Sequence, residues 1–148
     1  MTDIHDKKTR SRNMSAIKSK NTKPEIWLRK RLHAQGFRYR LNVPSLPGKP
    51  DIVLPKYKAI IFVHGCFWHA HECHLFKLPS TRTEFWKEKL YSNKSRDKTT
   101  NQTLILQGWR VLTIWECAIK GKTKLPEAEA LSKITDWILS TDSSCTIP

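Results

Sequence analysis

The sequence lacks any long apolar run and has few acidic residues. No segment approaches the roughly 20 consecutive apolar residues of a membrane-spanning helix. Residues 1–14, MTDIHDKKTRSRNM, contain no apolar block of the kind found in a secretory signal peptide. We therefore expect a cytoplasmic protein with no membrane segment. Only 13 Asp and Glu stand against 27 Lys and Arg, which gives a formal net charge of +14.

This excess of basic residues indicates a polyanionic partner, and nucleic acid is the leading candidate. A solvated basic surface or a contact with anionic lipid would give the same charge, so charge alone does not decide between them. The 148 residues are 39% hydrophobic and include 6 Trp, which is enough for the core of one compact domain. We expect a single domain over residues 1–148.

Hydrophobic periodicity predicts an α/β fold in the order helix, three strands, helix, strand, helix. A helix should follow Thr22, which has Glu25 at capping-box spacing, and should end at Gly36. Strands are expected at 37–43, 52–54, 59–63 and 109–115, and further helices at 81–107 and about 131–139. Residues 1–20 are typical of a basic helical segment or of a frayed tail, and 141–148 of a loose tail.

Cysteine and histidine gather after the apolar run that ends near Val63. In a reducing compartment, cysteines are thiols or metal ligands rather than disulfides. Cys66, His71 and Cys73 offer three of the four ligands that a zinc site needs. Cys117 follows the apolar run 109–115 in the same way that Cys66 follows its own run.

If these two strands are parallel neighbours, both cysteines emerge at one edge of the sheet. We therefore predict a structural zinc site of Cys66, His71, Cys73 and Cys117, with unrelated buried thiols as the alternative. Cys145 lies in the expected tail and is spare. A zinc ion with four protein ligands leaves His64, His69 and His74 for another purpose.

The segments KPDIVL (49–54) and AIIFVH (59–64) are comparable with the core of metal-dependent nucleases. In that core an Asp opens one strand of a hairpin, and an acidic residue and a Lys close the next. Here Asp51 opens the hairpin, while Phe62 and His64 occupy the closing positions. Mg²⁺ prefers one or two carboxylates plus waters, and it lowers the pKa of attacking water. We predict Mg²⁺ binding by Asp51 and the main-chain carbonyl of Val63.

His69 can accept a proton from water near neutral pH, and Glu25 would anchor metal-bound water or hold His69. Each residue also has a simpler interpretation. Asp51 can be a turn residue after proline, Glu25 only part of a helix cap, and His69 an ordinary surface or core residue. The combination of these residues, rather than any one of them, favours a nuclease.

Four stretches of the sequence closely resemble the very short patch repair (Vsr) mismatch endonucleases. They are HDKKTRSRNMSAI, LPGKPDIV, FVHGCFWHAHECHLFKLPSTRTEFW and GWRVLTIWEC. They occur in the family's order, and the likeness runs from about Asp3 to Trp137. The resemblance implies a restriction-endonuclease-like fold, with a mixed central sheet flanked by helices, a structural Zn²⁺, and Mg²⁺-dependent nicking of double-stranded DNA 5′ to the T of a T:G mismatch. Such mismatches arise when 5-methylcytosine deaminates, which links the function to a DNA cytosine-5 methyltransferase.

By position, the resemblance places the metal carboxylate on Asp51, the catalytic histidines on His64 and His69, and the supporting acid on Glu25. The implied zinc ligands are Cys66, His71, Cys73 and Cys117. The resemblance also implies a wedge that enters the base stack beside the mismatch, formed by Phe67, Trp68 and Trp86, with Met14 entering from the other groove. A buried core position is the alternative for Trp86.

Two positions depart from the family's pattern, because Val63 replaces Thr and Glu72 replaces His. The first change is harmless if the metal contacts the main-chain carbonyl, whereas the second leaves the parts played by Glu72 and His74 open. Two other functions are compatible with the sequence. They are a non-catalytic, zinc-stabilised protein that binds mismatched DNA, and a restriction-type nuclease that cuts paired duplex. One asymmetric mismatch gives no reason for a two-fold dimer, so we expect a monomer associated with the nucleoid.

Overall fold

The computed structural model describes residues 22–147. They form, in chain order, helix α2 (Lys23–Ala34), strands β1 (Arg40–Leu41), β2 (Ile52–Leu54) and β3 (Ala59–His64), helix α3 (Thr83–Leu106), strand β4 (Arg110–Trp115), helix α4 (Glu127–Leu139) and strand β5 (Cys145–Ile147). The expected order of helices and strands is confirmed, with one additional strand at the end. The predicted N-terminal segment 1–20, including Met14, lies outside the described residues.

The five strands make one mixed sheet in the order β1-β2-β3-β4-β5. β1 and β3 each pair with β2 in antiparallel fashion, whereas β3 pairs with β4, and β4 with β5, in parallel. The register of β3 and β4 runs from Ala59 opposite Arg110 to His64 opposite Trp115. Both strands therefore end at the same edge of the sheet, and the chain emerges there on the way to Cys66 and Cys117, as the sequence predicted.

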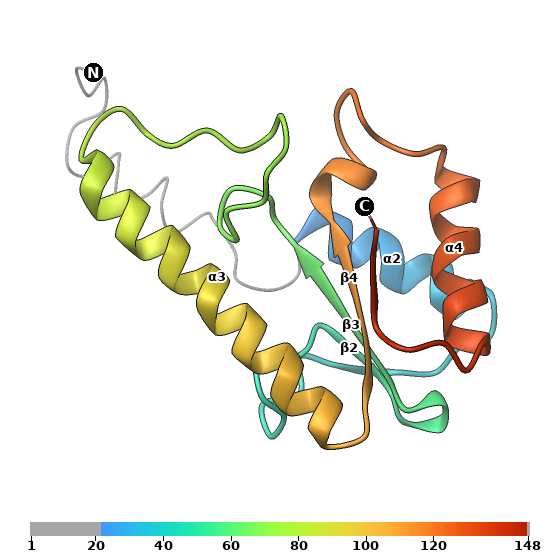
Figure 1. Cartoon of the computed structure of the whole chain (residues 1–148). Helices are drawn as coiled ribbons and strands as arrows, with labels where there is room; N and C mark the ends of the chain where they lie inside the picture. The colour runs from blue at the N-terminus through green and yellow to red at the C-terminus, as the bar shows by residue number, and fades with distance from the viewer. Residues whose placement is uncertain (1–21, 148) are drawn as a thin grey trace, which may run out of the picture.

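Strand β3 is buried along its whole length, because α3 covers one face of the sheet and α2 and α4 cover the other (Figure 1). Ile61 packs in the larger core with Leu28 of α2 and with residues of α4. Phe62 points the opposite way and packs with Leu104 of α3 in a smaller core. Side chains alternate along a strand, so His64 continues the row that faces α3.

Helix α3 packs closely on the sheet only near its C-terminal end. Leu104 belongs to the smaller core, and Leu90 is the other buried residue of this 24-residue helix. The loop 65–82 runs between the end of β3 and the N-terminal half of α3 (Figure 1). This arrangement places polar residues of α3 beside the loop that carries the cysteines and histidines.

The helix boundaries follow the local signals in the sequence. The Thr22 side chain accepts a hydrogen bond from the amide of Glu25 (3.4 Å) at the start of α2. Gly36 (φ 93°) and Gly108 (φ 92°) follow the ends of α2 and α3 in the left-handed region that favours glycine. No helix among the described residues is long and apolar enough to cross a membrane.

The prediction of a loose tail at 141–148 was wrong for residues 145–147, which form β5. β5 pairs with β4 through main-chain hydrogen bonds, and Ser144 Oγ accepts a hydrogen bond from the amide of Val111 (2.9 Å). Arg110 strengthens this end by donating to the carbonyl of Asp142 (3.3 Å). A short polar segment that pairs only through its main chain has no pattern of side chains by which the strand could be predicted.

Two further expectations differ from the structure. The expected strand 37–43 is reduced to Arg40–Leu41. Leu139, which was expected on the apolar face of α4, is exposed.

Candidate active site and metal centre

A groove of about 1160 Å³ opens beside the sheet, between α2 and α3. Its walls include seven of the predicted catalytic or DNA-contacting residues, namely Glu25, Asp51, Val63, His64, Phe67, Trp68 and His69, whereas Trp86 does not line it. The basic residues Lys49 and Arg96 also line it. The fold thus brings segments far apart in the chain to one concave surface.

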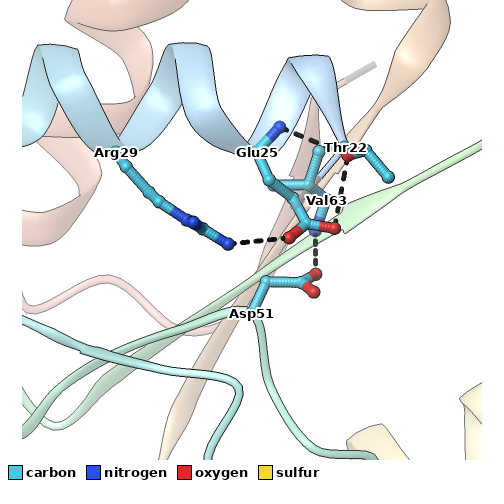
Figure 2. Close-up of polar contacts among 5 residues, drawn as sticks. All are labelled: Thr22, Glu25, Arg29, Asp51 and Val63. Atoms are coloured by element: carbon cyan, nitrogen blue, oxygen red, sulfur yellow. Dashed lines mark hydrogen bonds and ion pairs between the residues drawn. The ribbon is translucent and has the colours of Figure 1, made fainter. Parts of the chain in front are cut away.

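Asp51 is fixed against strand β3 at the mouth of the β2–β3 hairpin. Its Oδ2 accepts a hydrogen bond from the main-chain amide of Val63 (2.7 Å), which Figure 2 shows. Burial raises the pKa of Asp51 to about 7, the Val63 hydrogen bond opposes this rise, and the negative charge of Glu25 adds to it. A cation bound here would favour the charged form of Asp51, so the carboxyl group suits a metal site.

Glu25 is buried in the first turn of α2, with only 2% of its surface exposed. Its Oε2 lies 3.2 Å from Nη2 of Arg29, and its Oε1 accepts a hydrogen bond from the Thr22 hydroxyl (3.2 Å) (Figure 2). Glu25 therefore takes part in the helix cap and lines the groove as well. The sequence left open whether Glu25 belongs to the active site or only to the helix cap, and its position is compatible with both.

The rings of His64 and His69 are stacked, with centroids 3.8 Å apart and planes 6° from parallel. His64 is buried, and its Nδ1 has no hydrogen-bond partner within residues 22–147. Burial, and then the neighbouring His69, lower the pKa of His64 to about 3, so this imidazole is neutral at physiological pH. His69 is held differently, because its Nδ1 pairs with Oδ2 of Asp97 on α3.

Ligand atoms of His64, His69 and Asp97 lie within 4.8 Å of one another, which raises the question of a shared metal ion. The lone pair of an imidazole nitrogen lies in the plane of its ring. Since the two rings are nearly parallel, a single ion cannot lie in both planes, and Nδ1 of His69 already pairs with Asp97. We therefore interpret these groups as a carboxylate–imidazole pair with a second imidazole stacked on it.

The sequence analysis missed Asp97. It lies 28 residues after His69, in the polar middle of a long helix where a charged residue suggests only a solvated surface. The one available signal was that α3 is long and has few apolar residues, which leaves its polar face free to contact another part of the chain.

Ligand atoms of four residues at the common end of β3 and β4 also lie within 4.8 Å of one another, and these residues are Cys66, His71, Cys73 and Cys117. Nδ1 of His71 is 3.5 Å from Sγ of both Cys66 and Cys117. The ring of Trp115 stacks on His71 at 4.0 Å and holds its orientation. Three thiols and one imidazole are a donor set typical of structural zinc, and four protein ligands leave no position for substrate. The residues present fit such an ion.

The neighbouring polar residues stand apart from this cluster. Glu72 is exposed and lies 4.0 Å from Nζ of Lys94 on α3. His74 is exposed, and its Nδ1 is 3.4 Å from the Thr123 hydroxyl. Cys145 is exposed on β5. None of these three side chains is among the four clustered donors.

Phe67, Trp68 and Trp86 form a cluster of mutually contacting rings. The centroid of Phe67 is 5.1 Å from that of Trp68 and 5.7 Å from that of Trp86, and the two tryptophan rings are 6.0 Å apart. All three side chains are partly exposed. Trp86 therefore lies outside the core of the sheet. The alternative, a buried core position for Trp86, does not hold.

The comparisons with known proteins found one family model and several related proteins. The model of the family "DNA mismatch endonuclease Vsr" matches residues 2–75, which include Glu25, Asp51, His64 and His69. The DNA mismatch endonuclease Vsr of Escherichia coli strain K12 is 47% identical over 147 residues, covering 99% of this chain and 94% of that protein. The type II nicking enzyme V.NmeAIP of Neisseria meningitidis serogroup A is 48% identical over 122 residues, covering 82% and 87%. The type II nicking enzyme V.HpaIIP of Haemophilus parainfluenzae is 40% identical over 119 residues, covering 80% and 81%.

Proposed function

The chain belongs to the Vsr family of DNA mismatch endonucleases, and we propose that it nicks double-stranded DNA 5′ to the T of a T:G mismatch. The observation that carries this proposal is the placement of Asp51 and His69 in one groove with the partly exposed aromatic residues Phe67 and Trp68. Deamination of 5-methylcytosine would supply such a mismatch, so the enzyme would act with a DNA cytosine-5 methyltransferase and start very short patch repair.

We also propose that the fold is restriction-endonuclease-like. Three features support this: the mixed sheet, the helices on both of its faces, and the β2–β3 hairpin opened by Asp51. We further propose one domain that acts as a monomer on nucleoid DNA, with the basic segment 1–20 as an additional contact to the duplex.

Asp51 and the main-chain carbonyl of Val63 would hold Mg²⁺ in this groove. Bound there, Mg²⁺ would neutralise charge on the scissile phosphate and lower the pKa of the attacking water. The hydrogen bond from the Val63 amide fixes the Asp51 carboxyl group beside β3. Glu25, held by Arg29, would orient water at the opposite wall.

His69 is the proposed proton acceptor. Because Asp97 accepts the hydrogen bond from Nδ1, the neutral ring carries its lone pair on Nε2, which can take a proton from water. The negative charge of Asp97 then stabilises the protonated ring. His64 stays neutral beneath it and would donate a hydrogen bond to the phosphate, in the position where related nucleases have a lysine.

A structural Zn²⁺ on Cys66, His71, Cys73 and Cys117 would lock the loop that follows β3. Phe67, Trp68 and His69 lie between the first two of these ligands in the sequence. The ion would thus position both the wedge and the proton acceptor through the backbone of one loop.

The wedge of Phe67, Trp68 and Trp86 would enter the base stack beside the mismatch, with Met14 entering from the other groove. Unstacking a base step costs a few kcal/mol, and a weakly paired mismatch yields more readily than a Watson–Crick pair. The basic residues Lys49 and Arg96 in the groove suit the phosphate backbone.

The test is nicking of end-labelled duplexes that carry T:G, T:A or C:G at one position, with Mg²⁺ and with Asp51→Ala as the inactive variant. We expect one cut 5′ to the mismatched T, absent with Asp51→Ala, while DNA binding is retained. Binding without any cut would favour the non-catalytic recognition protein instead. Cleavage of both strands of the paired duplexes would favour a restriction-type nuclease.

A further inference from the structure

A buried arginine lies beside the two acidic side chains at the proposed Mg²⁺ site. Glu25 in the first turn of α2 and Asp51 just before β2 both line the groove. Figure 2 shows the side chain of Arg29 reaching from α2 toward the carboxylate of Glu25, above Asp51. Nη2 of Arg29 is 3.2 Å from Oε2 of Glu25, at the i, i+4 spacing that favours such a pair. One positive and two negative groups therefore lie together at this wall of the groove.

The hydrogen bonds of Arg29 do not account for its burial. Only 14% of its side chain is exposed, and only 3% of that of Glu25. Nε of Arg29 is buried and has no hydrogen-bond partner within residues 22–147. A buried guanidinium group with an unpaired donor costs free energy. The positive charge that Arg29 brings to two carboxyl groups is therefore the better explanation for its position.

The charge of Arg29 also acts on the proposed metal ligand. Burial raises the pKa of Asp51 to about 7, while the positive charge of Arg29 acts in the opposite direction. A positive charge that is felt at this carboxyl group also repels a cation bound to it. Mg²⁺ in the groove would therefore be attracted by Asp51 and Glu25 and repelled by Arg29.

These three groups do not balance the charge of the ion. With both carboxylates ionised, the two negative charges of Glu25 and Asp51 and the positive charge of Arg29 leave one negative charge, whereas Mg²⁺ carries two positive charges. Proteins commonly hold Mg²⁺ by one or two carboxylates together with a phosphate of the substrate. The phosphate at the nicked bond would supply the second negative charge.

We propose that Arg29 weakens Mg²⁺ binding to the DNA-free protein, so that the charge of the metal site is balanced only when a DNA phosphate enters the groove. The inference rests on the proposed function, because it concerns the same Mg²⁺ site. Arg29 is not among the described residues that line the groove. It is therefore a positioning residue, which holds the Glu25 carboxylate and sets the charge of the site from behind.

The test compares variants of α2 that differ in charge but little in helix propensity. Arg29→Gln and Arg29→Met remove the positive charge, and Arg29→Lys keeps it. Lys30→Met removes a charge from the next, exposed position and is the matched control. Mg²⁺ binding to the DNA-free protein is measured at pH 8 by competition with Mn²⁺, whose unbound ion gives an electron paramagnetic resonance signal. The same titration of Asp51→Asn identifies the ion bound at this site.

We expect Arg29→Gln and Arg29→Met to bind Mg²⁺ about 10-fold more tightly than the wild-type protein, because the repulsion is removed. Arg29→Lys keeps the charge and Lys30→Met removes only a charge screened by solvent, so both should stay within about twofold of wild type. The Mg²⁺ concentration that gives half the maximal single-turnover nicking rate should fall in the two neutral variants. Without Mg²⁺, these two variants should unfold at a lower temperature, because Glu25 loses a buried partner.

A purely structural role for Arg29 would give a different result, because disorder around Glu25 lowers stability and metal affinity together. Unchanged or weaker Mg²⁺ binding by Arg29→Gln and Arg29→Met would therefore overturn the inference. Equally tight binding by Lys30→Met would also overturn it, since the effect would then come from the general charge of the protein. The same holds for Arg29→Lys, because tighter binding there would depend on the shape of the side chain.

Two further outcomes separate the inference from the proposed function. Mg²⁺ binding by Asp51→Asn equal to that of wild type would place the ion elsewhere and overturn the inference. Failure of the wild-type protein to nick any T:G duplex would instead refute the proposed function. The Mg²⁺ affinities of the DNA-free proteins would then still decide the inference, since they are measured without cleavage.

Discussion

His69 and Asp97 are paired through Nδ1 and Oδ2, which joins the loop after β3 to the middle of α3. The pairing gives the imidazole one orientation and one neutral tautomer, and both side chains remain about one quarter exposed. A helix that contributes little to the core of the sheet therefore helps to build the groove in which the reaction is proposed to occur.

Asp97→Asn should slow the nicking of T:G duplexes about 10-fold to 100-fold, because the amide cannot stabilise the protonated ring of His69. Single-turnover rates with saturating enzyme measure this effect apart from DNA binding. Asp136→Asn, on the exposed side of α4, is the matched control and should keep the wild-type rate. An Asp97→Asn rate within twofold of the wild-type rate would contradict the assignment.

Asp51 makes the stability of the metal-free protein depend on pH. Its pKa is raised from 3.8 to about 7 on folding, so the folded state holds a proton that the unfolded state has already released between these values. The folded state is therefore stabilised by the protonated Asp51 carboxyl group. This contribution is complete below about pH 4 and is lost as the pH rises through about 7. Without Mg²⁺ at pH 8, Asp51→Asn should be more stable than wild type by about 1–3 kcal/mol.

Urea unfolding of both proteins at pH 5 and pH 8, in buffer without Mg²⁺, measures this difference. Added Mg²⁺ should raise the stability of the wild-type protein at pH 8 and leave Asp51→Asn unchanged. Parallel pH profiles of the two proteins would show that Asp51 is charged in the metal-free fold.

Cys117→Ser should lose bound zinc and stability together, since structural zinc contributes on the order of several kcal/mol to folding. Metal analysis of the purified protein and its thermal unfolding midpoint are the two measurements. Cys145→Ser provides the control, because Cys145 is an exposed thiol outside the cluster and its replacement should change neither quantity. A stable, zinc-loaded Cys117→Ser protein would mean that the fourth ligand lies elsewhere.

Arg110→Lys should destabilise the protein by about 1–3 kcal/mol with little effect on the nicking rate at low temperature. The guanidinium group of Arg110 donates hydrogen bonds to the carbonyls of Tyr57, Trp137 and Ile138, each at 2.9 Å. It also lies over the ring of Trp137 at 4.6 Å. Lysine keeps the charge but has no planar fork to reach these acceptors together.

Urea unfolding compares Arg110→Lys with Arg40→Lys, a change of the same kind at an exposed position on β1. The control should unfold at the wild-type urea concentration. Equal midpoints for the two variants would mean that Arg110 does not hold β4 to the end of α4.

Much of the fold was predictable because its signals are local. The spacing of apolar residues predicts the helices and buried strands, Thr22 marks the start of α2, and Gly108 follows the end of α3. The clustering of Cys66 and Cys117 was also predictable. It needed only the inference that β3 and β4 are parallel neighbours, because parallel strands end at the same edge of a sheet.

The sequence by itself therefore determined the order of the main elements and the family, and it predicted the residues of the two candidate metal sites. The tertiary structure alone decided how α3 is rotated and seated, and thus that Asp97 faces His69. It also decided that the polar end of the chain forms β5. These features depend on contacts between residues distant in the chain and on main-chain pairing, and neither leaves a periodic pattern of side chains that could be recognised beforehand.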